Sequence, residues 1–87
     1  MTTTTTTTTT YFVALPFSGS EDGPVPGQAQ ECQSANAAIG LARAMARVKG
    51  NVGAVAFKRD GDPNIGEFAD AEILAKVGET PDDLGEL

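Results

Sequence analysis

The chain has 87 residues and a net charge of −6 at pH 7, with one cysteine and no histidine. This length allows one domain. The negative charge argues against a nucleic-acid partner, because phosphate groups would repel the protein. One cysteine without any histidine excludes an internal disulfide and a zinc site. A core in so short a chain barely offsets the conformational entropy lost on folding. We therefore expect self-association, most simply as a homodimer.

Both ends of the chain differ in composition from its middle. Met1 is followed by nine threonines, a tract with no hydrophobic period, so we expect residues 1–10 to form a disordered tail. Residues 79–87 (ETPDDLGEL) predict an acidic flexible tail, which leaves 11–78 as a single domain. The start lacks the charged and apolar regions of a signal peptide, and Tyr11–Phe17 is too short to span a bilayer. We expect a cytoplasmic protein without membrane contact.

The first expected element is a strand over Tyr11–Phe17 (YFVALPF). It is apolar on both faces, which predicts a strand covered on both sides. Pro16 cannot donate to a ladder and marks the strand's end or an edge. The glycines and prolines of Ser18–Gly27 predict a loop, and Gln28–Gln33 is expected to be a brief extended segment.

A helix is predicted over Ser34–Lys49, with Ser34 as N-cap and Gly50 as the residue that follows the last turn. Its apolar stripe is wider than packing on one sheet requires. Either the helix also meets a second surface, such as another subunit, or its alanines simply tolerate water. The stripe consists of Ala38, Leu41, Ala42, Met45 and Val48.

Two further strands are predicted over Asn51–Arg59 and Glu67–Val77, joined by a hairpin loop at Asp60–Gly66. Alternation favours a strand for the last segment, although its Ala, Glu, Leu and Lys residues also suit a helix. We prefer the strand because the preceding loop suits a hairpin and a two-stranded sheet would be too small. The residues expected to face the core are Val55, Phe57, Ile73 and Val77.

These elements predict an α+β fold, a small βαββ domain with one helix packed on a three-stranded, mostly antiparallel sheet. A right-handed β–α–β crossover would set Tyr11–Phe17 parallel to Asn51–Arg59. The hairpin would set Glu67–Val77 antiparallel to the same strand. Either the second or the third strand could be central.

One loop resembles a metal-binding sequence. Asp60–Asn64 (DGDPN) places side-chain oxygens at the first, third and fifth positions, as in a calcium-binding loop. Gly66 and Glu72, however, each fall one position later than such a loop requires. A plain turn is therefore the preferred interpretation.

Other residue types that carry chemistry are isolated. Cys32 has no nearby base in the sequence and follows Glu31, so a small, partly buried side chain is favoured over a nucleophile. Asp70 and Glu72 could act as an acid–base pair, but exposed acids are ordinary on a strand and protect its edge. We expect no enzyme, and no catalytic, cofactor-binding or metal-binding residues.

The sequence GAVAFKRDGDPNIGEFADAEILAKVGETPDDL resembles the C-terminal part of a family of small uncharacterised bacterial proteins. In these proteins a hydrophobic run leads into an R-x-G-D-P-x-x-G-E-like turn and a closing P-D-D-L. The resemblance implies that the hairpin is a real unit. It carries no function and no site residues.

The sequence favours a non-enzymatic accessory or interaction module that acts as a homodimer. One alternative is a small-ligand or calcium-binding protein that uses Asp60–Asn64. Another is an acidic regulatory partner of a basic protein, because nine acidic residues and only Lys76 as a base lie in Asp60–Leu87. The other five bases cluster between Arg43 and Arg59.

Overall fold

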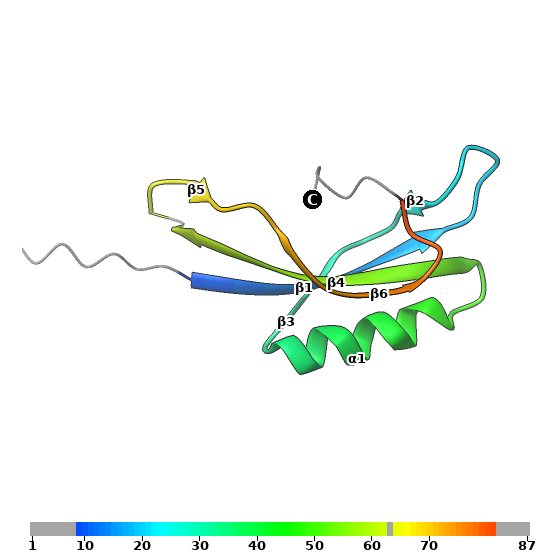
Figure 1. Ribbon diagram of the computed structural model, residues 1–87, viewed down its shortest axis with the longest axis horizontal. Coiled ribbons are helices and arrows are strands. Elements are labelled where there is room, and N and C mark those ends of the chain that lie inside the picture. The colour runs from blue at the N-terminus through cyan, green and yellow to red at the C-terminus, as the bar shows by residue number, and fades with distance from the viewer. Residues whose placement is uncertain (1–8, 63, 82–87) are drawn as a thin grey trace, which may run out of the picture.

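The computed structural model describes residues 9–62 and 64–81 (Figure 1). These residues form one α-helix and six β-strands. In chain order they are β1 (Thr9–Ser18), β2 (Val25–Pro26), β3 (Gln30–Cys32), α1 (Ala35–Ala46), β4 (Asn51–Asp62), β5 (Glu67–Phe68) and β6 (Glu72–Gly78). No helix in this part of the chain is long and apolar enough to cross a membrane.

Two long strands, β1 and β4, form the centre of the sheet (Figure 1). They pair antiparallel along nearly their whole length, with Leu15 opposite Val55 and Phe17 opposite Gly53. The other edge of β1 pairs with β2 and β3, and the other edge of β4 pairs with β5 and β6, all antiparallel. Each central strand therefore has two short partners placed end to end.

The predicted three-stranded sheet in βαββ order is wrong. Half of the described residues lie in a six-stranded, curled antiparallel sheet. Two of the additional strands are β2, inside the predicted loop Ser18–Gly27, and β3, inside the predicted extended segment Gln28–Gln33. Strands of two and three residues are too short to show a hydrophobic period, so the sequence left β2 inside a loop and indicated β3 only as part of a brief extended segment.

The predicted parallel arrangement of the first strand and β4 is also wrong, because β1 and β4 are antiparallel. After β1 the chain reverses and returns along it as β3, with Cys32 opposite Phe12. The crossover through α1 therefore joins β3 to β4. These two strands both run antiparallel to β1 and hence parallel to each other, with β1 between them. The crossover exists, but its first strand is β3.

The segment Glu67–Val77 forms strand, not helix, although it is interrupted between β5 and β6. The preceding loop is shorter than predicted, because β4 continues to Asp62. The β4–β6 register shifts between Ala56 and Phe57, which leaves Leu74 as an additional residue on β6. Such a bulge reverses which side chains of a strand face a given side of the sheet.

Helix α1 begins close to the predicted position and ends earlier. The Ser34 hydroxyl accepts a hydrogen bond from the Ala37 N–H at 3.1 Å, which confirms Ser34 as the N-cap. The helix ends at Ala46 with Arg47 as its C-cap, so the predicted extension to Lys49 is wrong. The chain then turns before β4 through Gly50, whose φ of 97° lies in the left-handed region that favours glycine.

The face of the sheet that α1 covers is built from alanine. Small side chains on both surfaces let the helix backbone approach the sheet closely. Larger apolar side chains surround this seam, Leu41, Met45 and Leu74 among them. Of the predicted helical stripe, only Val48 does not join, because it lies beyond the helix end and is exposed. The fully buried residues of the seam are Ala14, Ala38, Ala42, Ala54 and Ala56.

The opposite, helix-free face carries a second apolar cluster. Its buried members are Leu15, Phe17, Val55 and Phe57, and Val13, Ala71 and Ile73 pack against them. The prediction that Val55, Phe57 and Ile73 share a core face is confirmed. Val77 does not share it, because Val77 lies opposite Ala54 of the alanine seam, and directly paired residues lie on the same face. The bulge at Leu74 explains the difference.

Candidate functional site

The helix-free face ends in an open groove at the β4–β5 hairpin. The groove has a volume of about 460 Å³, within the range of ligand-binding clefts. Strands β1, β3, β4 and β5 all contribute to it. The lining residues are Tyr11, Val13, Ala29, Glu31, Phe57, Arg59 and Phe68.

The register between β1 and β4 builds the floor of the groove. Tyr11 lies opposite Arg59, and Val13 lies opposite Phe57. Successive side chains on a strand alternate between faces, so these two pairs lie side by side on the helix-free face. Cross-strand pairs of aromatic and β-branched side chains stabilise a sheet by about 0.2–1 kcal/mol each. The floor of the groove is therefore also part of the fold.

Phe68 forms a wall of the groove. It lies opposite Gly61, and its ring occupies the space that a Cβ atom on Gly61 would need. The ring also packs against Tyr11, with ring centroids 6.1 Å apart and an interplanar angle of 48°. Phe68 nevertheless remains 53% exposed, so an aromatic surface is held open to solvent at this end of the sheet.

Arg59 is the cation of the groove. Its Nε atom is buried and has no hydrogen-bond partner among the described residues. The ion pair present in the described residues joins Lys58 Nζ to Glu72 Oε2 at 3.3 Å, and it does not include Arg59. A buried donor without a partner costs about 1–3 kcal/mol. The other charged residue that lines the groove is Glu31 on β3, and the remaining lining side chains are apolar or aromatic.

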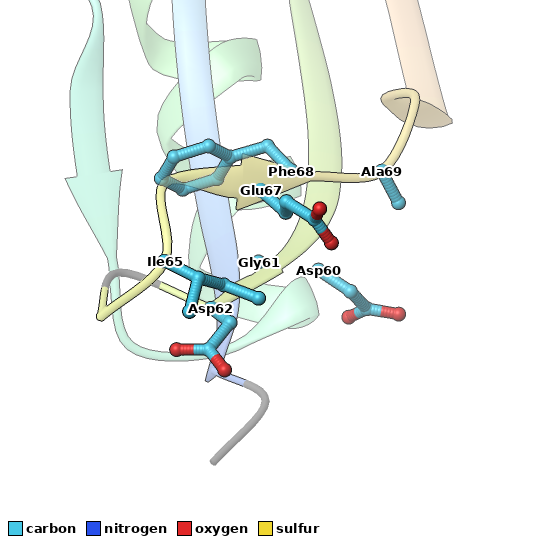
Figure 2. A pocket seen from close by; sticks show the side chains of 7 residues that line it. All are labelled: Asp60, Gly61, Asp62, Ile65, Glu67, Phe68 and Ala69. Carbon is cyan, nitrogen blue, oxygen red and sulfur yellow. The ribbon is translucent and has the colours of Figure 1, made fainter. Parts of the chain in front are cut away.

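A second hollow, of about 370 Å³, lies on the hairpin itself (Figure 2). Its lining includes Asp60, Gly61 and Asp62, from the segment that was weighed as an alternative calcium site. In Figure 2 the carboxylates of Asp60 and Asp62 point away from each other. Asp60 accepts a hydrogen bond from the Thr10 hydroxyl at 2.6 Å, and Asp62 accepts one from the Asn64 N–H at 2.9 Å. Within residues 9–62 and 64–81, no three His, Cys, Asp or Glu residues gather to hold a metal ion. The Asp60 carboxylate thus bonds across the β1–β4 pair and the Asp62 carboxylate bonds within the local turn, and this arrangement does not favour calcium binding.

The other residues weighed from the sequence are not brought together. Cys32 is half-buried, with its Sγ 3.7 Å from the Gln30 carbonyl oxygen. Glu72 forms the ion pair with Lys58, whereas Asp70 lies in the connection between β5 and β6. The sequence analysis did not identify the groove. Tyr11 and Arg59 each lie in a strand that the sequence predicted. Only the register between β1 and β4 shows that these two residues lie opposite each other.

A comparison of the chain with known protein families, curated proteins and solved structures found no match.

Proposed function

We propose that the protein is a non-enzymatic interaction module that acts as a homodimer. The observation that supports this function is an exposed apolar surface at the hairpin. Ile65 is 65% exposed and Phe68 is 53% exposed, and the groove lies beside Phe68. Large apolar side chains gathered on one surface are typical of protein–protein contacts. We call Ile65, Phe68 and the adjoining groove the hairpin patch.

The composition of the core also favours association. Every fully buried residue of the helix-covered cluster is an alanine, and the largest fully buried side chains are Phe17 and Val55. Burial contributes about 25 cal/mol per Å² of apolar surface, so alanine contributes little. Covering the hairpin patch with a second copy would add apolar burial that one chain lacks, and a partner that binds only the folded state stabilises it.

The lining of the groove favours binding over catalysis. Most of the described lining side chains are apolar or aromatic, and the two charged groups, Arg59 and Glu31, lie on different strands. Side chains of this kind exclude water and orient a bound surface. Acid–base or nucleophilic chemistry requires a reactive group within hydrogen-bond reach of a base.

Sedimentation at micromolar concentration tests the proposal. The expected species has twice the chain mass of 8.9 kDa. Ile65→Asp should shift the equilibrium towards monomer, because it places a charge in the apolar contact. Val48→Asp is the matched control, since Val48 is 56% exposed but lies after α1, at the other end of the sheet from β5 (Figure 1). A wild-type monomer with a cooperative melting transition would contradict the homodimer.

We also propose a cytoplasmic location. A reduced, half-buried Cys32 suits a compartment that keeps thiols reduced. Cell fractionation should recover the protein with the cytoplasmic fraction, and recovery from a secreted or membrane fraction would contradict this location.

A further inference from the structure

The groove carries one cation and one anion on the same face of the sheet. Arg59 on β4 lies opposite Tyr11 of β1, and Glu31 on β3 lies opposite Val13 of β1. Directly paired residues share a face, and residues two positions apart on a strand share it too. Both charged side chains therefore lie on the helix-free face, where both line the groove. A ligand with a single charge would meet its like charge there as well as its opposite.

The two charged residues are held apart by the strand between them. Since β3 and β4 flank β1, Arg59 and Glu31 are separated by two strand spacings, about 10 Å, and by two residues along the strands, about 7 Å. Within residues 9–62 and 64–81 no ion pair joins them. The Nε atom of Arg59 is buried, so the guanidinium lies against the protein instead of extending into solvent. A bound molecule with two separated charges could bridge the gap.

The surface between the two charges is apolar. Tyr11, Val13 and Phe57 lie along it, and Phe68, which is 53% exposed, forms a wall. The volume of about 460 Å³ lies in the lower part of the range for small-molecule clefts, which combine apolar walls with a few polar groups that fix orientation. The groove therefore matches a small ligand with an apolar middle and opposite charges at its two ends.

We propose that the groove binds a zwitterionic peptide of dipeptide size, with its carboxylate on Arg59, its ammonium on Glu31 and its apolar side chains against Phe57 and Phe68. This inference goes beyond the homodimer and does not depend on it. An arginine can bind a carboxylate through two parallel N–H···O bonds, and an ammonium donates a charge-assisted hydrogen bond to a carboxylate. A free amino acid carries both charges on one carbon atom, whereas a dipeptide separates them by a peptide unit and suits the wider gap.

Isothermal titration calorimetry of the full chain tests the ligand, with phenylalanyl-leucine as the probe. Acetylation of its ammonium group or amidation of its carboxylate should each weaken binding at least about tenfold, because each change removes a charge-assisted hydrogen bond. Glycylglycine has both charges but no apolar side chains, and it should also bind at least about tenfold more weakly than phenylalanyl-leucine.

Two variants assign the charges of the ligand to their partners. In Arg59→Gln the dipeptide and its amide should bind equally, because the partner of the carboxylate is gone. In Glu31→Gln the dipeptide and its acetylated form should bind equally, because the partner of the ammonium is gone. A merely structural role of either residue would not produce this selective loss. Glu21→Gln is the matched control, since Glu21 is exposed in the connection between β1 and β2, and it should leave every affinity unchanged.

The variant Ile65→Asp separates this ligand from the homodimer. Ile65 is not among the residues that line the groove, so the variant should bind phenylalanyl-leucine at least as tightly as the wild type. The absence of binding to both proteins, or equal affinities for the dipeptide and its two blocked forms, would overturn the ligand and leave the homodimer. A monomeric wild type that binds the dipeptide with the expected selectivity would overturn the homodimer and support the ligand.

Discussion

The ring of Phe68 lies over Gly61 on the neighbouring strand, in the space where any larger residue at position 61 would place its Cβ atom. Gly61 is buried by this contact although it is near the end of β4. The aromatic ring thus replaces the side chain that glycine lacks, a known means of stabilising glycine in a sheet. The same contact fixes the ring as a wall of the groove.

Gly61→Ala should therefore destabilise the fold by about 1–3 kcal/mol, because the added methyl group displaces the ring. The φ angle of Gly61 is not in the left-handed region, so backbone strain adds nothing to this cost. In a Phe68→Ala background the same substitution should cost less than about 0.5 kcal/mol, a coupling that a double-mutant cycle in urea measures. Equal costs in both backgrounds would contradict the contact.

The alanine seam predicts a strong dependence on side-chain volume. Ala42→Leu adds bulk at a fully buried position between α1 and the sheet and should cost about 1–3 kcal/mol or more, because a close-packed seam has no space for it. Ala44→Leu is the matched control, since Ala44 is exposed on the same helix. Chemical denaturation of both variants should separate them clearly, and similar stabilities would show that the seam is loosely packed.

The N-cap of α1 gives a smaller and more local prediction. Ser34→Ala removes the acceptor of the Ala37 N–H and should lower the free energy of unfolding by about 1 kcal/mol. Ser34→Asp retains an acceptor and adds a negative charge near the positive end of the helix dipole, so it should restore most of the loss. Urea titrations followed by circular dichroism provide the measurement, and a neutral Ser34→Ala would contradict the capping role.

Gly40 offers a substitution that should stabilise the protein. Gly40 lies in the middle of α1 and is exposed to solvent. A Cβ atom added there would meet no neighbour within 4 Å. Gly40→Ala should raise the free energy of unfolding by about 0.5–1 kcal/mol, because alanine loses less backbone entropy in a helix. Thermal unfolding monitors the change. A decrease would indicate that this helix surface contacts another molecule.

The sequence was sufficient to predict those features that depend on residues close together in the chain. The N-cap at Ser34, the buried stripe on α1 and the two long apolar strands follow from periodicity and capping chemistry, and the structure contains them. The helix end was placed too late because Val48 continues the apolar period after the helix has ended. A period by itself does not mark where backbone hydrogen bonds stop.

Features that depend on pairing could not be predicted in this way. The direction of β4 depends on the return of the chain through β3, whose three residues carry no distinctive pattern. The position of Val77 depends on a bulge at Leu74, which the alternation of β6 does not indicate. The groove depends on the register that brings Tyr11 opposite Arg59. Each of these is a relationship between distant segments rather than a property of one segment.

The crossover from β3 through α1 to β4 has a consequence for how the protein folds. Every pair in the central β1–β4 ladder joins residues on opposite sides of that crossover, so the main ladder cannot nucleate from a tight turn. Closing so long a loop loses chain entropy before any strand contact compensates for it, and folds dominated by such distant contacts fold slowly. The rate of refolding should therefore depend on how readily α1 forms and draws the two long strands together.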